Sequence, residues 1–413
     1  MGWCLYQFRK PFISGFRYSI SSMSAFTRFY SEKKWWHASE LLKGTLYYSH
    51  KKIDLLTNEE TSFTVEELNH ELNQFCLNEK RSHPHIWHFF YEFGFYSMDL
   101  PHLVEEQSPL AIHLEYQKVE ELTTLKLPHH PLKLEVIEDI DFKTYDEAFQ
   151  KGHEHLLRGD CYQYNLTYRN RYKIHGLNHV TDLWENLARE REGTGEYAHF
   201  SYLPQLNKCF ISNSPECLFD IENQSDFLKI ETRPIKGTRS LGEGEAIEKV
   251  WEELKSSEKD QAELYMIIDL LRNDMYRIEE RPIEIKELKK QLLVPGIVHQ
   301  MGVLEGELSH TVTLGQVMKA MFPGGSITGA PKKRVMEILK QIENTPRGFY
   351  CGSTVISWKN SIKSSINIRS AQMALSELVI DVHAGGGITL LSSNQQEFLE
   401  RQAKIDSFLV RIQ

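Results

Sequence analysis

The sequence predicts an α+β chain in which short apolar strands alternate with amphipathic helices. From about residue 140 onward, runs with the two-residue period of a strand are separated by segments with the 3.6-residue period of a helix. Three apolar runs near the C-terminus, 350–358, 365–373 and 378–383, are expected to be consecutive antiparallel strands. The chain has 413 residues, of which 41% are hydrophobic and 25% charged. This composition is that of an ordinary globular protein with a large core.

The first part of the chain, residues 32–139, carries few signals. Residues 45–56 are expected to form a strand pair, 64–76 a helix and 122–136 a connector. Two adjacent histidines in the connector, His129 and His130, invite a metal-site interpretation. No further ligand sits at a helpful spacing, and a metal site needs three or four convergent ligands. We therefore expect a surface loop there.

The second part has clearer elements. The expected helices are 145–157, 260–274, 331–342 and 393–412, and the expected strands are 161–168, 210–213 and 217–221. Pro331 stands at the first position of its helix, where its missing N–H costs nothing. Ser393 and Gln396 are spaced as a capping box. Ser214 and Pro215 break the chain between two of the strands.

Charge and composition exclude several classes of function. The net charge of -9 argues against a general nucleic-acid or anionic-membrane binder. There is no run of eighteen apolar residues, so we expect no membrane span. The six cysteines form no C-x-x-C pair and are expected to be reduced thiols of a cytoplasmic protein. Residues 1–31 lack acidic residues, as transit peptides do, but we favour a short leader or a start at Met23.

Lys236 is the most informative single residue, in the run E-T-R-P-I-K-G-T-R. A lysine amine held in a pocket tends to lose its proton and become a nucleophile. Most lysines beside a glycine are solvated turn residues, so the run alone decides little. The loop 322–332, F-P-G-G-S-I-T-G-A-P-K, places freed backbone amides before a helix, which favours an anion site. A plain tight turn is the alternative for that loop.

Acidic and basic residues complete the candidate site. Glu263 lies on the helix 260–274, and Glu397 and Glu400 share a face of the last helix with Lys404 one turn on. Carboxylates on separate helices suit a hard cation, although each alone is more often a solvated surface charge. Further candidates are a general acid, a carboxylate-binding arginine, a tyrosine and a histidine: Glu216, Arg369, Tyr350 and His299.

This ordered set of motifs resembles the chorismate-utilising enzymes over roughly residues 140–410. The matching segments are G-D-C-Y-Q-Y-N-L-T-Y-R from Gly159, S-P-E at 214–216, P-I-K-G-T at 234–238, A-E-L-Y-M-I-I-D-L-L-R-N-D from Ala262, F-P-G-G-S-I-T-G-A-P-K from Phe322, R-G-F-Y-C-G-S from Arg347, I-R at 368–369 and G-G-G-I from Gly385. The resemblance implies two facing antiparallel β-sheets with helices outside and the site between them. It makes residues 140–413 a chorismate-binding catalytic domain and 32–139 a weakly matching N-terminal region.

The residues at two positions distinguish the reactions that members of that family catalyse. Members that add water to C2 of chorismate carry a lysine where this chain has Gln163, and an amide cannot act as a base. Members that make anthranilate typically read P-I-A-G-T, whereas this chain has Lys236. The resemblance is therefore greatest to members that make 4-amino-4-deoxychorismate, with anthranilate synthesis as the alternative. The chain reads L-L-K-G at 41–44 in place of the L-L-E-S of tryptophan-regulated members, so tryptophan inhibition is not expected.

The resemblance also implies a mechanism and partners. Mg²⁺ held through Glu263 and Glu400, with Glu397 nearby, would neutralise the ring carboxylate. Lys236 would add to C2 while Glu216 protonates the leaving 4-hydroxyl, and ammonia would then displace the lysine. His299 would lie near the ring, and the groups expected to grip the substrate are Gln163, Thr328, Tyr350, Arg369, Gly385, Gly386 and Lys404.

No Cys-His-Glu glutaminase segment is visible, so the implied partner is a separate glutamine amidotransferase subunit. A downstream aminodeoxychorismate lyase would complete 4-aminobenzoate synthesis for folate. Two rivals of another class stay open: a non-catalytic chorismate binder, and an interaction protein that uses its aromatic N-terminal region. The retained acids, Glu216, Glu263 and Glu400, speak against the non-catalytic binder. Departures from the family pattern, such as Leu264 and Leu391, leave the assigned chemical groups in place.

Overall fold

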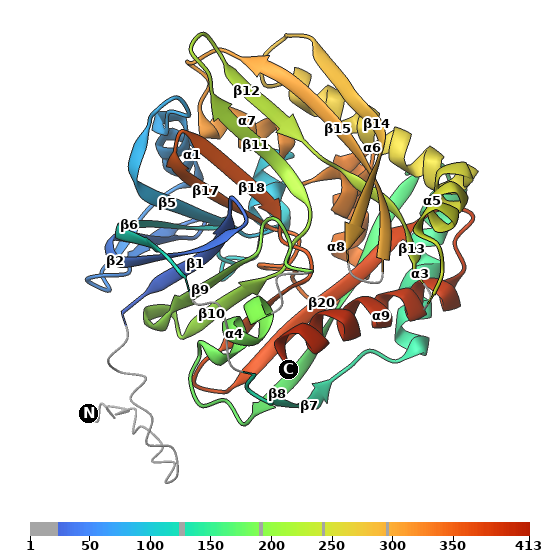
Figure 1. Ribbon diagram of the computed structural model, residues 1–413, viewed down its shortest axis with the longest axis horizontal. Coiled ribbons are helices and arrows are strands. Elements are labelled where there is room, and N and C mark those ends of the chain that lie inside the picture. Colours follow the sequence, from blue (N-terminus) through green and yellow to red (C-terminus); the bar gives the residue numbers. More distant parts are fainter. Residues whose placement is uncertain (1–23, 124–128, 190–192, 242–243, 295–296) are drawn as a thin grey trace, which may run out of the picture.

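The computed structural model describes residues 24–123, 129–189, 193–241, 244–294 and 297–413 (Figure 1). Within these residues the strands are all antiparallel and belong to one hydrogen-bonded series, with helices packed around it. The first half of the series runs β14 (Ile283–Val294), β15 (Ile297–Leu308), β12 (Leu228–Thr232), β11 (Cys217–Asn223), β18 (Ser361–Ile366), β17 (Ser353–Lys359), β5 (Arg81–Phe89) and β6 (Ala111–Glu121).

The second half continues from β6 to the other end of the sheet. It runs β2 (Lys34–Tyr47), β1 (Phe26–Ser31), β9 (His199–Leu203), β10 (Lys208–Ser212), β19 (Ser370–Ala374), β20 (Val379–Ile388), β8 (Gln163–His175) and β7 (Lys133–Glu138). Shorter strands branch from it: β3 (Lys51–Asp54), β4 (Glu60–Ser62), β13 (Ile235–Ser240) and β16 (Gly329–Ala330). The α+β class is thus confirmed, whereas a division into two facing sheets is not.

Two chain segments that lie side by side connect one half of the sheet to the other. The first crossover joins β10 to β11 and the second joins β18 to β19. β10 pairs with β9 and β19, but β11, which follows it, pairs with β12 and β18. Pro215 lies in the first crossover and has no N–H to continue a ladder. The second crossover separates β18 from β19 and contains Arg369 at φ 49°. The expected single strand 365–373 is therefore wrong, and β18 and β19 do not pair with each other.

Hydrogen bonds join the two crossovers. The amide of Asn213 donates to the carbonyl oxygen of Arg369 at 2.9 Å, and the amide of Ile366 donates to that of Glu216 at 3.0 Å. Glu216 and Arg369 therefore lie on two segments that are hydrogen-bonded to each other where the two halves of the sheet meet.

The helices mostly follow the expected pattern. The bounds are α1 (Val65–Gln74), α2 (Phe93–Ser97), α3 (Phe142–Leu157), α4 (Asp182–Arg189), α5 (Ile247–Ser256), α6 (Glu258–Tyr276), α7 (Leu314–Met321), α8 (Lys332–Ile342) and α9 (Asn394–Ile412), with short 3₁₀ turns η2 (Pro101–Leu103), η3 (Pro204–Leu206) and η4 (Gly325–Ile327). The expected capping box of α9 is wrong. The Ser393 side chain makes no cap bond, and only its carbonyl oxygen accepts, from the amide of Glu397 at 3.0 Å.

Two helices carry acidic candidates and are anchored by buried apolar faces. α6 buries Leu264, Ile267, Ile268 and Leu271 in the largest core cluster. α9 lies along β20 (Figure 1) and buries Ile405, Phe408, Leu409 and Ile412 in a second cluster. Each such side chain contributes about 1.5–3 kcal/mol by leaving water. The opposite faces of both helices are thereby held in fixed positions.

The N-terminal residues contribute to the same sheet. Residues 1–23 of the expected leader lie outside the described residues, but Phe26–Ser31 form β1 between β2 and β9. β5, from the weakly matching region, pairs with β17 from the expected catalytic domain. Among the described helices, none is long and apolar enough to cross a membrane.

Candidate active site

Lys236 projects from an irregular part of β13. The β13–β15 register shifts between Ile235 and Thr238, so the ladder is interrupted around Lys236. Gly237 has φ 80°, a conformation that disfavours a side chain, and a Cβ there would lie 2.9 Å from Leu254. The Lys236 Nζ donates to the Ser326 carbonyl oxygen at 3.4 Å. The amine therefore reaches from the sheet to the glycine-rich loop.

Burial shifts the pKa values of Lys236 and Glu216 in opposite directions. Burial lowers the pKa of Lys236, and the carboxylates of Glu263 and Glu216 partly oppose this shift. Burial raises the pKa of Glu216, which is 4% exposed. The Glu216 Oε1 is buried and has no hydrogen-bond partner among the residues that the structure describes. Burial thus shifts the pKa of Lys236 downward and that of Glu216 upward, towards the uncharged form of each group.

The glycines of β20 have no side chains of their own, and side chains from several other elements lie close to them. A Cβ on Gly387 would lie 2.1 Å from the Gln163 Nε2 and 3.6 Å from the Lys236 Nζ. A Cβ on Gly386 would lie 3.0 Å from the Glu397 Oε2 and 3.7 Å from the Lys404 Nζ. The expected strand 378–383 continues through these glycines to Ile388. Its extension brings residues from β8, β13 and α9 together.

The glycine-rich loop is held by its own hydrogen bonds. The Thr328 hydroxyl donates to the Gly324 carbonyl oxygen at 2.9 Å, and the Thr328 amide donates to that of Gly325. Sequence reasoning assigned no role to Arg347, although it lies in the matching R-G-F-Y-C-G-S segment. Buried Arg347 donates to the carbonyl oxygens of Ile327 and Asn165 at 2.7 and 2.6 Å, and so ties the loop to β8.

Three further candidates come from the segment before β17, the second crossover and β15. Tyr350 is buried and stacks on His383, with ring centroids 5.3 Å apart and planes at 11°. Arg369 donates to the Lys404 carbonyl oxygen at 3.4 Å, which links the second crossover to α9. The His299 Nδ1 lies 2.9 Å from the Thr238 hydroxyl, and burial lowers the pKa of His299 to about 4. Its ring is therefore neutral at pH 7.

The acidic candidates surround the same lysine. Glu263 on α6 and Glu400 on α9 both raise the pKa of Lys236, against the larger effect of burial. Glu400 also pairs with Lys404 at 2.8 Å, and Lys404 donates to the Gly385 carbonyl oxygen at 2.8 Å. A donor set of carboxylate oxygens fits a hard cation such as Mg²⁺. Glu263, Glu400 and Glu397 stay the predicted ligands of such an ion, and they are not the group of three ligand atoms that lie within 4.8 Å of one another among the described residues.

Comparison with known families decides what this arrangement is. The family model of the chorismate binding enzymes matches residues 29–410. The chain belongs to this chorismate-binding enzyme family. The match begins at residue 29, so it includes the N-terminal region in which the sequence showed no motif.

The curated relatives of this chorismate-binding enzyme include two kinds of synthase. It is 35% identical over 269 residues to aminodeoxychorismate synthase component 1 of Salmonella typhimurium, covering 64% of this chain and 56% of the relative. It is 32% identical over 272 residues to anthranilate synthase component 1 of Aquifex aeolicus, covering 65% of this chain and 53% of the relative. The matched part is thus little more than half the length of these relatives.

Solved structures share the fold of this family member. Anthranilate synthase component I of Streptococcus pneumoniae superimposes with a TM-score of 0.73 at 20% identity, over 96% of this chain and 95% of that one. A putative 2,3-dihydroxybenzoate-specific isochorismate synthase of Bacillus anthracis gives 0.70 at 18% identity, over 94% and 96%. Proteins of different named reactions therefore share one fold, so reaction type must be argued from side chains.

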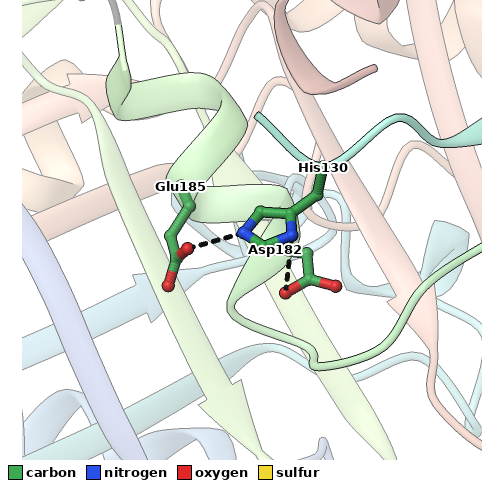
Figure 2. A group of neighbouring side chains, drawn as sticks. All are labelled: His130, Asp182 and Glu185. Carbon is green, nitrogen blue, oxygen red and sulfur yellow. Dashed lines mark hydrogen bonds and ion pairs between the residues drawn. The ribbon is translucent and has the colours of Figure 1, made fainter. Parts of the chain in front are cut away.

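One of the two connector histidines, His130, has acidic neighbours that the sequence did not predict. His130, Asp182 and Glu185 each offer a ligand atom within 4.8 Å of the others (Figure 2). His129 and His130 do lie outside helices and strands, exposed and half-buried, as the expected loop requires, but two acidic side chains lie beside His130. The two acids lie some fifty residues further along the chain, one turn apart on α4, so spacing around the histidines could not reveal them.

Proposed function

We propose that this chain is the chorismate-converting subunit of an aminodeoxychorismate synthase. The observation that carries the proposal is the Lys236 amine, partly buried and within 3.4 Å of the Ser326 carbonyl oxygen. Its lowered pKa increases the fraction of neutral, nucleophilic amine at pH 7. Relatives named aminodeoxychorismate synthase component 1, at 33–35% identity, support the same reaction.

The first chemical step uses the two groups with opposed pKa shifts. The Lys236 Nζ forms a bond to C2 of the chorismate ring, both conjugated ring double bonds shift by one position, and the C4–O bond breaks. The departing 4-hydroxyl takes a proton from Glu216, whose raised pKa increases the fraction of the carboxyl that carries one, and leaves as water. This step produces a ring joined covalently to Lys236.

The second step reverses the attachment. Ammonia forms a bond to C4, both double bonds shift back, and the C2–N bond to Lys236 breaks. Lys236 leaves as the free amine, the nitrogen now at C4 gives one proton to Glu216 and so restores its acid form, and the product is 4-amino-4-deoxychorismate. Over both steps chorismate and ammonia become product and water, so Lys236 acts as a true catalyst.

Binding and orientation fall to the residues around the glycines of β20. We assign the substrate carboxylates to Arg369, Lys404, Tyr350 and the amides of Gly385 and Gly386. Mg²⁺ bound by Glu263 and Glu400 would neutralise a ring carboxylate and draw charge from the diene. Glu397, Thr328 and neutral His299 line the same site. The amide of Gln163 cannot deprotonate a water, which disfavours the hydration performed by isochorismate synthases.

Ammonia is proposed to come from a separate glutamine amidotransferase subunit. Relatives of this chain carry "component 1" in their names, which implies a second component. The product would then pass to an aminodeoxychorismate lyase for 4-aminobenzoate and folate synthesis. Anthranilate synthesis is the second candidate, because the Aquifex aeolicus relative matches with similar identity and coverage.

A product assay separates the two candidates. The purified chain is incubated with chorismate, Mg²⁺ and ammonium, with and without an aminodeoxychorismate lyase, and aromatic products are resolved by chromatography. We expect 4-aminobenzoate only when the lyase is present. Anthranilate formed without lyase would overturn the proposal in favour of the second candidate, and chorismate bound but unconverted would favour a non-catalytic binder.

A further inference from the structure

We propose that His130, Asp182 and Glu185 form a binding site for a first-row transition-metal ion, such as Zn²⁺ or Co²⁺. The three residues come from the connector before β7 and from α4, and none is among the candidates for the chorismate site (Figure 2). The site is thus separate from the Mg²⁺-type carboxylates on α6 and α9.

The ring of His130 faces a carboxylate on each side. Its Nε2 lies 2.8 Å from the Glu185 Oε2, which is a hydrogen-bond distance. Its Nδ1 lies 3.8 Å from the Asp182 Oδ1, which is too long for an N–H···O bond. A neutral ring that donates Nε2–H to Glu185 presents its Nδ1 lone pair to a carboxylate oxygen. Two electron-pair donors then face each other, and a cation between them removes the repulsion.

The separation of these two atoms is close to that of two metal ligands. Zn²⁺ lies about 2.0–2.2 Å from nitrogen and carboxylate ligands, so two tetrahedral ligands are roughly 3.4 Å apart. The observed 3.8 Å needs only a small closure. The hydrogen bond from the other ring nitrogen to Glu185 matches the carboxylate–histidine–metal arrangement that orients metal-binding rings. Glu185 can serve in that role or, after a small rotation, as a third ligand.

The ligands are fixed independently of one another. The amide of His130 donates to the Asn186 side-chain oxygen at 2.9 Å, and the Asn186 side chain donates back to the His130 carbonyl oxygen at 2.7 Å. Asp182, 2% exposed, accepts from the amides of Asn178 and His179 through Oδ2, so its Oδ1 points to the ring. A site whose ligands are already held loses little entropy when it binds an ion.

Charge and ligand type indicate the class of ion. Two carboxylates bring two negative charges, and the nearby guanidinium of Arg28, whose pKa Glu185 raises against a larger effect of burial, supplies one positive charge. The remaining negative charge favours a cation. An imidazole nitrogen with carboxylate oxygens suits Zn²⁺, Co²⁺ or Mn²⁺, whereas Mg²⁺ prefers oxygen ligands alone.

Metal binding to the full chain tests this proposal. The protein is stripped with a chelator and dialysed with excess Mg²⁺ to occupy oxygen-only sites. Co²⁺ is then added, bound metal is measured by elemental analysis, and its visible absorption is recorded. We expect wild-type protein to bind stoichiometric Co²⁺ with tetrahedral-type bands, His130→Gln to lose both, and Glu185→Gln to bind about tenfold more weakly or worse.

Two matched histidines serve as controls. His129→Gln removes the neighbouring ring, and His175→Gln removes an exposed ring that contacts Glu135 at the same 2.8 Å. Both variants should bind Co²⁺ like wild type. Equal binding by His130→Gln and wild type, or no Co²⁺ bound by folded wild type, would overturn the proposal. A ¹⁵N spectrum showing both His130 nitrogens protonated in the presence of Zn²⁺ would also overturn it. If His130→Gln does not fold, Glu185→Gln, at a partly exposed position, decides.

Discussion

The Lys332 Nζ donates a 2.7 Å hydrogen bond to the Asp274 Oδ2, and the two side chains are only 6% and 2% exposed. Asp274 lies near the end of α6, the helix that carries Glu263. Lys332 opens α8 and is the last residue of the glycine-rich loop, whose Ser326 carbonyl oxygen accepts from Lys236. This buried ion pair therefore fixes the loop relative to the helix with the proposed metal ligand. The pair joins the LLRND segment, which contains Asp274, to the GAPK segment, which contains Lys332.

Breaking this pair is expected to destabilise the fold strongly. Lys332→Met leaves the Asp274 carboxylate buried without its cation, which costs about 3–5 kcal/mol of unfolding free energy. Urea unfolding followed by circular dichroism measures the change. The control is Arg158→Met, which removes an exposed pair with Glu154 and should cost roughly 0.5 kcal/mol or less. Similar losses in the two variants would contradict the buried-pair interpretation.

Alanine substitutions at neighbouring glycines of β20 should have different effects. A Cβ on Gly385 would lie 2.1 Å from the Leu166 backbone oxygen, which cannot move without disturbing β8. Gly385→Ala should therefore destabilise by about 1–3 kcal/mol or more. A Cβ on Gly386 meets only the flexible ends of Glu397 and Lys404, so Gly386→Ala should keep its melting temperature but raise KM for chorismate.

Thermal unfolding and steady-state kinetics of the two variants check this difference. A fully stable Gly385→Ala protein, or a Gly386→Ala protein with unchanged KM, would show that these glycines do not set the spacing inferred from the backbone.

Buried His383 should make the protein sensitive to acid. Burial lowers the pKa of His383 to about 3, whereas an unfolded histidine titrates near 6.5. Between these values the unfolded chain binds a proton that the folded ring does not, so stability falls as the pH falls. The contribution is about 1.4 kcal/mol per pH unit inside that window.

His383→Phe is the matched variant, because phenylalanine can keep the stack on Tyr350 and cannot titrate. Urea unfolding at a series of pH values from about 7.5 to 5 measures the two slopes. The variant should lose stability less steeply than wild type below pH 6.5, and parallel slopes would rule out His383 as a source of the acid sensitivity.

Local patterns predicted the helices better than the sheet. The apolar period of α6 follows from neighbouring residues, because helix hydrogen bonds are local, and so does the start of α8, although Pro331 is its N-cap and not its first helical residue as predicted. The break of the strand 365–373 at Arg369 depends on which distant strands β18 and β19 pair with. The capping box at Ser393 failed although its spacing was right, because the serine side chain makes no cap bond. Sheet pairing and side-chain geometry are tertiary properties that a single sequence carries only weakly.

The candidate site shows the same division. The motifs named Lys236, Glu216 and the carboxylates of α6 and α9. The structure places Lys236 and Glu397 against the glycines of β20, and it places Glu216, Glu263 and Glu400 close enough to Lys236 to raise its pKa against the effect of burial. Arg347 was missed because a buried arginine that ties backbone oxygens has no sequence signature beyond its place in a motif. The cluster at His130 was missed because its ligands are brought together by the fold.

Mass spectrometry of the chain treated with chorismate and Mg²⁺, with ammonia left out, tests the role of Lys236 most directly. Without ammonia the second step stops, so the ring should remain attached to the lysine. Digestion should then give a peptide containing Lys236 that is heavier by chorismate less one water, and Lys236→Ala should give no adduct and no aminated product. A Lys236→Ala protein that converts chorismate and ammonium at the wild-type rate would contradict the account.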